Sequence, residues 1–551
     1  MGKYSSLFLL FIISFSLSFK CGYNEIKKPE LKILNESKNI DSNTRNLESK
    51  RNINIYIDYE VLEFQVLSEE ITEDYYKNLA KALNSTVNYL SKLLMVQGPK
   101  VIYLEGYLFS SIDYIKRAEV PNIIFKYINT DLILIPKVYY MGSNIDAAAY
   151  PIALNNYDNH PICGGILLGF HYDFSQLNAQ RYLIMLLLHE ITHILGFSNY
   201  LYDYFQTPYN LTTNKTVNEI NRTLFTGPNV IKQAKRHFNC NDIEGIELEN
   251  QGGDGSVGSH WEARIMLGDY MISTDYGEIV ISEISLALLE DSGWYTVNYY
   301  TGGLFRYGKG LGCDFLNNKC VSDNITSFKR EFCVENRERC FAGNIDRGYC
   351  YLSYYNDIPS EYQYFNSSEY GGFFPADYCP VTMSYSYYYY YYFFSKCDSY
   401  GYNYNKLTPE YGEIYGDKSI CVLSSLKPLS SISDDFMTAR CHKVISCNPD
   451  KTFSLDIGNV ILNCSGNYEE VEVEGYYGTI ICPDYNRVCT GSIWCNDPLI
   501  CIEKESLYLE ENNIKENIFE ENNSYVNVDV LFENRIKINI FIYVYIILIL
   551  F

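Results

Sequence analysis

Apolar and polar residues follow regular patterns along the first half of the chain, and these patterns predict strands. The segment INIYIDY places Ile53, Ile55 and Ile57 on one face, which is typical of a half-buried strand. The apolar runs LILI, residues 132–135, and GGILLGF, residues 164–170, predict two further strands. The chain therefore begins its folded part with strand-forming sequence.

Two helices are predicted beside these strands. Thr72 can cap the first, because its hydroxyl can accept a hydrogen bond from a backbone N–H of the first turn. Apolar residues then recur at intervals of three and four along this helix: Leu79, Leu83, Val87, Leu90 and Leu94. The second helix runs from about residue 176 to residue 195, and Gly196 stands where a helix C-terminal glycine is common. Helices and strands in this order predict an α/β or α+β unit, and we expect the α+β class.

The pattern changes at Cys313. From Cys313 onward the chain has short predicted strands, many turns and 15 of the 18 cysteines, so we expect a separate disulfide-rich domain that is mostly β or irregular. Within it, SYSYYYYYYFF at residues 384–394 is of low complexity. This run is either a solvent-facing insertion or an adhesive patch.

Length and charge narrow the class of protein. A chain of 551 residues is long enough for more than one domain. It carries 44 Lys and Arg against 67 Asp and Glu, a net charge of -23, and shows no basic stripe. Binding of nucleic acid through its phosphates is therefore not expected.

The N-terminal segment MGKYSSLFLLFIISFSLSFKC predicts a secretory signal peptide. Lys3 gives a positive start, residues 7–15 an apolar run, and residues 16–18 small residues suited to cleavage. The alternative, a buried N-terminal helix, fits the position and flanks less well. Secretion permits disulfides and glycosylation. Acceptor sequons for N-linked glycans occur at Asn84, Asn210, Asn214, Asn221, Asn324, Asn366 and Asn463.

The C-terminal segment INIFIYVYIILILF, residues 538–551, predicts attachment to a membrane. It is short for a bilayer span, which needs about 20 residues, and better suits the tail of a GPI-attachment signal. Residues 522–524 offer small residues for the attachment point, and residues 525–537 a largely polar spacer. A short peptide anchor is the nearest alternative, and a buried C-terminal strand is a third.

The segment LLLHEITHILGFSNY carries the clearest chemical signal. His189 and His193 lie four residues apart and so share one face of a helix, where both can bind a single Zn²⁺. Glu190 is offset by one residue and can accept a proton from a water on the metal. With 7 histidines in the chain, about one such sequence in a hundred would show H-E-x-x-H by chance. Two histidines in an apolar core are the alternative interpretation.

A catalytic zinc site needs a third protein ligand. The pattern that begins with H-E-x-x-H and a following glycine would place a histidine at position 199, but the residue is Asn199. The segment NQGGDGSVGSHWEARIMLGDYM offers His260 behind a glycine-rich stretch that can let the chain return to the helix. Met271 follows eleven residues later, in a position to form a turn beneath the metal. The remaining histidines have no such context: His160, His171, His237 and His442.

These motifs together resemble leishmanolysin, a family of surface metzincin zinc proteases. The resemblance is carried by HEITHILGF, by the long insertion that follows it, by QGGDGSVGSH, and by Met271 eleven residues after His260. It continues through ISLALLEDSGWY, GCDFLNNKC, DYCPV and TIICPDYNRVC. It covers roughly residues 52 to 500. The family fold is a metzincin-like catalytic domain with an inserted segment between the second and third zinc ligands. The resemblance therefore explains why position 199 is not a histidine, and it places the third ligand at His260.

The resemblance also implies a role for each site residue. His189, His193 and His260 match the ligands of one catalytic zinc ion, Glu190 the general base, and Met271 the Met-turn. Members of the family carry a propeptide cysteine, flanked by histidines, that holds the zinc before activation. Cys21 stands in about that place without the histidines. It is either such a zinc-blocking thiol or a cysteine at the signal junction, and the missing histidines favour the second.

We therefore expect a zinc endopeptidase of the secretory pathway and cell surface, which binds protein substrates in extended form and contributes to cell adhesion. GGILLGF is the expected edge strand for such substrates. A non-catalytic adhesin that retains the fold is the alternative, and a structural coat protein does not explain the His, Glu and Met spacing. The predicted divisions are a signal peptide at 1–18, a propeptide or linker at 19–51, an N-terminal catalytic subdomain at 52–198, the insertion with third ligand and Met-turn at 199–300, a cysteine-rich domain at 301–505, and an acidic linker with anchor signal at 506–551.

Overall fold

The computed structural model describes residues 32–34, 50–97, 101–104, 126–139, 146–169, 177–251, 257–274, 279–299, 305–383, 397, 411–416, 418–430, 437–466 and 468–489. The expectations for the signal peptide, Cys21, His171, the tyrosine-rich run and the C-terminal tail lie outside these residues. No helix within the described ranges is long and apolar enough to cross a lipid bilayer.

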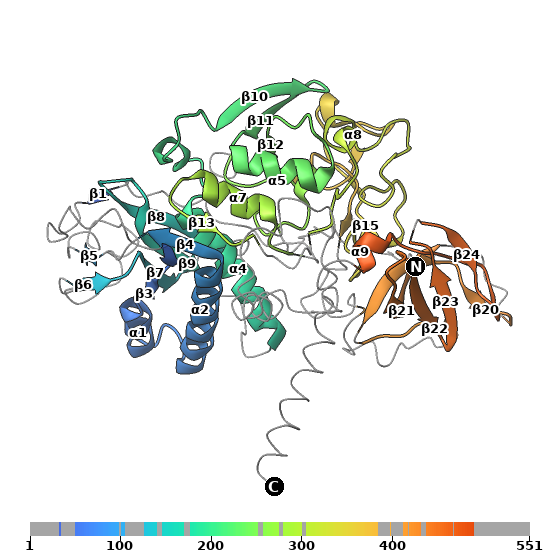
Figure 1. Cartoon of the computed structure of the whole chain (residues 1–551), viewed down its shortest axis with the longest axis horizontal. Helices are drawn as coiled ribbons and strands as arrows, with labels where there is room; N and C mark the ends of the chain where they lie inside the picture. The colour runs from blue at the N-terminus through green and yellow to red at the C-terminus, as the bar shows by residue number, and fades with distance from the viewer. Residues whose placement is uncertain are drawn as a thin grey trace, which may run out of the picture.

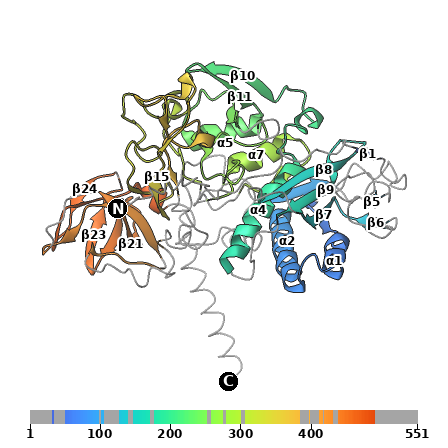
Figure 2. The same cartoon turned by 180° about the vertical axis from the view of Figure 1, so that it is seen from behind.

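A five-stranded sheet and three helices form the N-terminal part (Figure 1). The strands lie in the order β1 (Lys32–Leu34), β8 (Ala147–Asn155), β9 (Pro161–Leu168), β7 (Leu132–Val138) and β3 (Ile55–Ile57). The helices are α1 (Glu60–Leu67), α2 (Glu73–Leu93) and α4 (Leu177–Leu195). In Figures 1 and 2 these helices lie on one side of the sheet, where α1 contacts β7, α2 contacts β3, and α4 contacts β8 and β9.

The predicted helix after Thr72 is confirmed. The Thr72 hydroxyl accepts a hydrogen bond from the Tyr75 backbone N–H at 3.2 Å, and the helix buries Leu79, Leu83 and Leu90. Leu94, expected at its end, already belongs to the next strand, β4 (Leu94–Gln97). The helix therefore keeps its apolar face on the sheet and on α4.

The expectation that GGILLGF forms an edge strand is wrong. Its residues 164–168 belong to β9, which pairs in parallel with β7 on one side and antiparallel with β8 on the other. Both rows of its backbone groups are used in the ladder, so no substrate strand can be added there. Among the described strands, β1 covers the outer edge of β8 only at Ala153–Asn155.

The middle of the chain adds a hairpin and short helices above the sheet (Figure 1). β10 (Thr212–Val217), β11 (Ile220–Phe225) and β12 (Ile246–Leu248) form an antiparallel sheet. The helices of this middle part are η2 (Tyr202–Tyr204), α5 (Pro228–Phe238), α6 (Ala263–Met266) and α7 (Glu283–Asp291). β13 (Thr296–Val297) then pairs with β4, which also pairs with β2 (Lys50–Asn52), and so joins the middle of the chain to its N-terminal part. β5 (Val101–Leu104) and β6 (Lys126–Asn129) form a separate pair.

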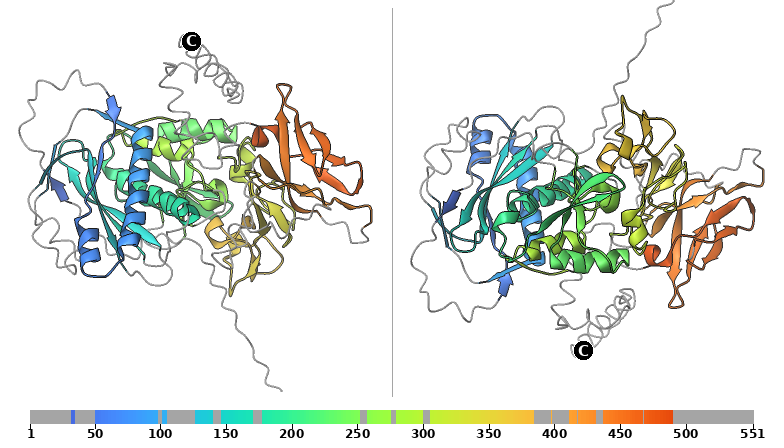
Figure 3. Two further views of the ribbon diagram at one scale, coloured as in Figure 1. Left: turned by 90° about the horizontal axis from the view of Figure 1, so that it is seen from below. Right: turned by 90° about the horizontal axis from the view of Figure 1, so that it is seen from above.

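The region after residue 305 consists of short strands and a second large sheet. Six antiparallel strands lie in the order β23 (Val460–Cys464), β22 (Phe453–Ile457), β21 (Thr438–Cys447), β19 (Ser419–Ser424), β26 (Thr479–Ile481) and β24 (Glu470–Glu472). The remaining elements are α8 (Cys313–Asn317), β14 (Glu338–Cys340), β15 (Arg347–Cys350), β16 (Ser353–Tyr354), η3 (Ser360–Tyr362), β17 (Tyr370–Gly371), η4 (Phe374–Ala376), β18 (Thr382–Met383), β20 (Lys427–Pro428), β25 (Tyr476–Tyr477) and α9 (Tyr485–Val488). Figure 3 shows the N-terminal, middle and C-terminal parts in a row.

Seven disulfides join the described cysteines, all but one of them wholly after residue 313. The pairs are Cys240–Cys313, Cys320–Cys379, Cys333–Cys350, Cys340–Cys421, Cys397–Cys441, Cys447–Cys489 and Cys464–Cys482. Cys163 in β9 is a buried thiol. The expected mixture of helices and strands, with a disulfide-rich region toward the C-terminus, is confirmed.

Candidate metal centre

Helix α4 presents two histidines on one face. It is packed against α2, β8 and β9, and Gly164 of β9 lets it approach closely, because a Cβ at that glycine would lie 2.5 Å from the Ile194 side chain. His189 and His193 are buried, with 2% and 0% of their surface exposed. The helix ends at Leu195, so both histidines lie in its last two turns.

His260 joins these two histidines from a distant part of the chain. Its ring centroid lies 5.2 Å from that of His189 and 4.9 Å from that of His193. The Nε2 atoms of His189 and His193 are 3.1 Å apart, and one nitrogen from each of the three rings lies within 4.8 Å of the others. The structure therefore brings together the three histidines that the sequence singled out.

Each histidine is held by a contact of its Nδ1 atom. Nδ1 of His189 lies 2.6 Å from the carbonyl oxygen of Tyr270, and Nδ1 of His193 lies 2.7 Å from that of Phe197. A carbonyl oxygen only accepts, so Nδ1 carries the proton and Nε2 keeps its lone pair. Burial and the neighbouring His260 lower the pKa of His189 to about 3, which keeps this ring neutral.

A carboxylate holds the third histidine. Oε2 of Glu249 lies 3.1 Å from Nδ1 of His260, and Oε1 of Glu249 accepts a hydrogen bond from the Ser273 hydroxyl at 2.5 Å. Such a carboxylate fixes the orientation of a metal-binding imidazole and the nitrogen that carries its proton. Three imidazoles, each held through Nδ1, are a donor set that fits Zn²⁺ with a fourth position for water.

Asn199 holds the returning chain in place. Its backbone N–H donates to the Ser259 hydroxyl at 3.2 Å, and its side-chain amide donates to the carbonyl oxygen of Val257 at 3.0 Å. The Tyr202 hydroxyl donates to the carbonyl oxygen of Gly258 at 3.0 Å. The residue at the position of the missing histidine thus fixes the segment that supplies His260.

Met271 lies in a buried turn next to the histidines. The Asp269 carboxylate accepts hydrogen bonds from the Met271 backbone N–H at 2.7 Å and from the Ser285 hydroxyl. Ser285 in turn accepts from the indole N–H of Trp261, the residue after His260. This network fixes the turn, and with it the Tyr270 carbonyl that holds His189.

Glu190 follows His189 on α4, and its side chain is fully buried. A carboxylate buried beside a metal site has little access to bulk water, which suits a base that exchanges protons with a bound water.

Comparison with known proteins decides the family. The profile of the leishmanolysin family matches residues 112–495. The chain belongs to the leishmanolysin family. The resemblance seen in the motifs is therefore confirmed.

Several leishmanolysin relatives share parts of the sequence. A leishmanolysin homolog of Crithidia fasciculata is 29% identical over 321 residues, which are 55% of this chain and 47% of that protein. A leishmanolysin-like peptidase of Drosophila melanogaster is 32% identical over 379 residues, 56% of this chain and 55% of that protein. The leishmanolysin of Leishmania major is 25% identical over 353 residues, 61% of this chain and 56% of that protein. The chain spans about half the length of these curated relatives.

The other described histidines of this leishmanolysin-family chain lie apart from the metal centre. Nε2 of His237 lies 2.8 Å from the Tyr307 carbonyl, and burial lowers its pKa to about 3. Nδ1 of His442 lies 2.8 Å from the Gly412 carbonyl. Each of these contacts ties two segments of the fold together, which is a structural use of the ring.

An apolar hollow of about 20 Å³ opens beside His189. Its other lining residues come from α4 and from the chain after the methionine turn: Tyr182, Met185, Leu186, Tyr270, Ile272, Thr274 and Ile279. This hollow, Glu249 and the Tyr270 carbonyl could not be predicted from the sequence, because no short motif contains them. The glutamate eleven residues before His260 could have been considered only once the third ligand was known.

Proposed function

We propose that the protein is a zinc-dependent endopeptidase that cleaves extracellular or cell-surface proteins. One observation carries the proposal: His189, His193 and His260 converge with their outer nitrogens anchored, next to the buried Glu190. Membership of the leishmanolysin family and the peptidase named among the relatives support it. We also infer a metzincin-like fold in which the chain from Asn199 to Ser259 is the insertion.

In this proposal the three histidines hold the metal through their Nε2 atoms. A bound zinc ion supplies a Lewis acid that polarises the peptide carbonyl and makes a bound water acidic. Glu190 accepts the proton of the attacking water on its carboxylate and passes it to the nitrogen of the leaving amine. Glu249 and the Tyr270 and Phe197 carbonyls keep the histidines oriented through both steps.

The substrate would lie extended along β8. Among the described strands, only β1 pairs with the outer edge of β8, at Ala153–Asn155, and β8 packs against the helix that carries His189. A substrate strand added along Ala147–Ile152 would gain backbone hydrogen bonds.

Removal of the metal tests the activity directly. We expect the purified protein to contain one zinc ion per chain and to hydrolyse casein. Dialysis against a chelator should abolish both, and added Zn²⁺ should restore both, because three histidines bind zinc reversibly. Atomic absorption and release of casein peptides measure the outcome. A protein that hydrolyses casein without zinc, or binds zinc without hydrolysis, would rule out the proposed enzyme, and the second result favours the adhesin.

We further propose that the protein passes through the secretory pathway and stays on the cell surface. The seven disulfides suit an oxidising compartment. The seven sequon asparagines named above are exposed, so glycans could be attached there without disturbing the core.

Phosphatidylinositol-specific phospholipase should release the protein from intact cells, and mass spectrometry should show that residues 538–551 are missing, because a GPI signal is removed when the lipid is attached. Retention of the protein with Phe551 present would show a peptide anchor instead. A protein that is neither released nor membrane-bound would contradict surface attachment.

A further inference from the structure

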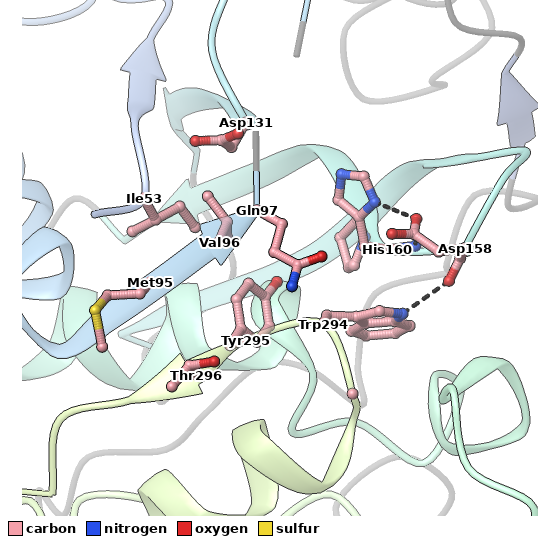
Figure 4. Close-up of a pocket in the computed structure, with 12 residues that line it drawn as sticks. Ile53, Met95, Val96, Gln97, Asp131, Asp158, His160, Trp294, Tyr295 and Thr296 are labelled. Atoms are coloured by element: carbon pink, nitrogen blue, oxygen red, sulfur yellow. Dashed lines mark hydrogen bonds and ion pairs between the residues drawn. The ribbon is translucent and has the colours of Figure 1, made fainter. Parts of the chain in front are cut away.

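A second cavity lies apart from the metal centre. It has a volume of about 170 Å³ and lies between β4, the start of β13 and the turn that joins β8 to β9 (Figure 4). None of the three converging histidines lines it. An apolar cavity of about 150 Å³ can hold a benzene molecule, so this cavity has room for a small organic ligand.

The polar part of the lining is acidic. Asp131 and Asp158 line the cavity together with His160, and no lysine or arginine is among the lining residues. Nδ1 of His160 lies 2.5 Å from Oδ1 of Asp158. Arg51, outside the lining, donates to both oxygens of Asp131 at 2.6 and 2.7 Å. Two carboxylates therefore line the cavity, one of them bonded to Arg51 and the other in contact with His160.

The other side of the cavity is aromatic, as Figure 4 shows for Trp294 and Tyr295. The indole N–H of Trp294 donates to the Asp158 carbonyl at 2.8 Å, and its ring packs edge-on against Phe205 at 4.9 Å. The Trp294 ring is therefore held in one orientation. A fixed indole face attracts organic cations.

The Tyr295 hydroxyl supplies a hydrogen-bonding group. Tyr295 is 6% exposed, and it lines the cavity. Burial and the charges of Asp158 and Asp131 raise the pKa of its hydroxyl, so it stays protonated. A ligand in the cavity can form a hydrogen bond with this hydroxyl.

We propose that this cavity binds a small organic cation, with one ammonium or guanidinium group on a compact apolar body. The charged group would lie among Asp158, Asp131 and the Tyr295 hydroxyl, and the apolar body against Trp294. A cationic group suits a cavity that two carboxylates and no lysine or arginine line. The same chemistry could come from a free amine or from a lysine or arginine side chain of a bound protein.

Benzylamine is a suitable probe, because it combines a ring with one ammonium group. We expect calorimetry on the purified full chain to show one site for benzylamine and at least tenfold weaker binding of the neutral isostere benzyl alcohol. Tyr295→Phe and Asp158→Asn should each weaken benzylamine by about tenfold, the size expected for loss of one hydrogen bond to a charged group. Asp203→Asn, an exposed change of the same kind, should have no effect.

Three results would overturn the proposal. They are equal binding of benzyl alcohol, unchanged binding in Tyr295→Phe, and loss of binding when a peptide hydroxamate saturates the metal centre, which would place benzylamine there. If Asp158→Asn fails to fold, Tyr295→Phe still tests the proposal, since it removes only a hydroxyl that faces the cavity. If benzylamine inhibits casein hydrolysis competitively, the natural ligand of the cavity is a side chain of the substrate. If hydrolysis is unchanged, the natural ligand is a free amine.

Discussion

Glu190→Gln should keep one zinc ion per chain and lose peptidase activity by a factor of about a hundred to ten thousand, the usual contribution of a general base. The side chain is fully buried next to His189 on α4, and glutamine has almost the same shape. The three histidines and their anchors are untouched by the change. What disappears is the group that accepts a proton from the attacking water.

The measurements for this variant are zinc content, thermal unfolding and the rate of casein hydrolysis. Glu283→Gln in the first turn of α7 is a matched control, because it makes the same chemical change elsewhere on a helix. We expect the control to match the wild type in all three. Full activity in Glu190→Gln would show that the assigned mechanism is wrong, whereas loss of zinc would show that Glu190 supports the ligands instead.

His260→Ala should lose both the metal and the activity. Two histidines and water bind zinc much less well than three histidines, and the variant also leaves the Glu249 carboxylate without the imidazole it now contacts at 3.1 Å. We expect substoichiometric zinc after dialysis in buffer that the wild type tolerates. The change should not prevent folding, because His260 belongs to neither the five-stranded nor the six-stranded sheet and to none of the seven disulfides.

Two further variants serve as comparisons for the zinc loss expected of His260→Ala. Glu249→Gln should keep the zinc but release it to a chelator about 10 to 100 times more readily, which is the usual effect of losing the partner of a metal ligand. His237→Ala should keep its zinc, although loss of the hydrogen bond to Tyr307 should lower its unfolding temperature. Equal loss of zinc from His237→Ala and His260→Ala would contradict the choice of the third ligand.

Local pattern was enough to predict the elements that carry the metal centre. The helix after Thr72 and the helix ending at Leu195 have apolar periodicity and recognisable ends, and the structure has both. The three histidines needed more than pattern, since His260 stands about sixty residues from the expected place. The resemblance to a family supplied that distance, and no physical property of the segment alone would have done so.

Strand order could not be predicted in the same way. A fully buried strand such as β9 has apolar residues on both faces, so its sequence does not reveal whether it lies inside a sheet or at an edge. The contacts that hold the histidines in place could not be predicted from the sequence either. Glu249 reaches His260, and the Tyr270 carbonyl reaches His189, only because the chain folds back across long separations. Such pairings are fixed by the tertiary fold.

The hydrogen bonds of Asn199 have a consequence for how this site tolerates change. The chain leaves the active-site helix at Asn199 and comes back to the same residue at Val257 and Ser259. The segment between them forms a loop whose two ends are joined at Asn199, and closing a longer loop costs only slightly more entropy. Outside the part that carries Glu249, which holds His260, residues can therefore be inserted or removed while the third ligand stays in place beside the first two.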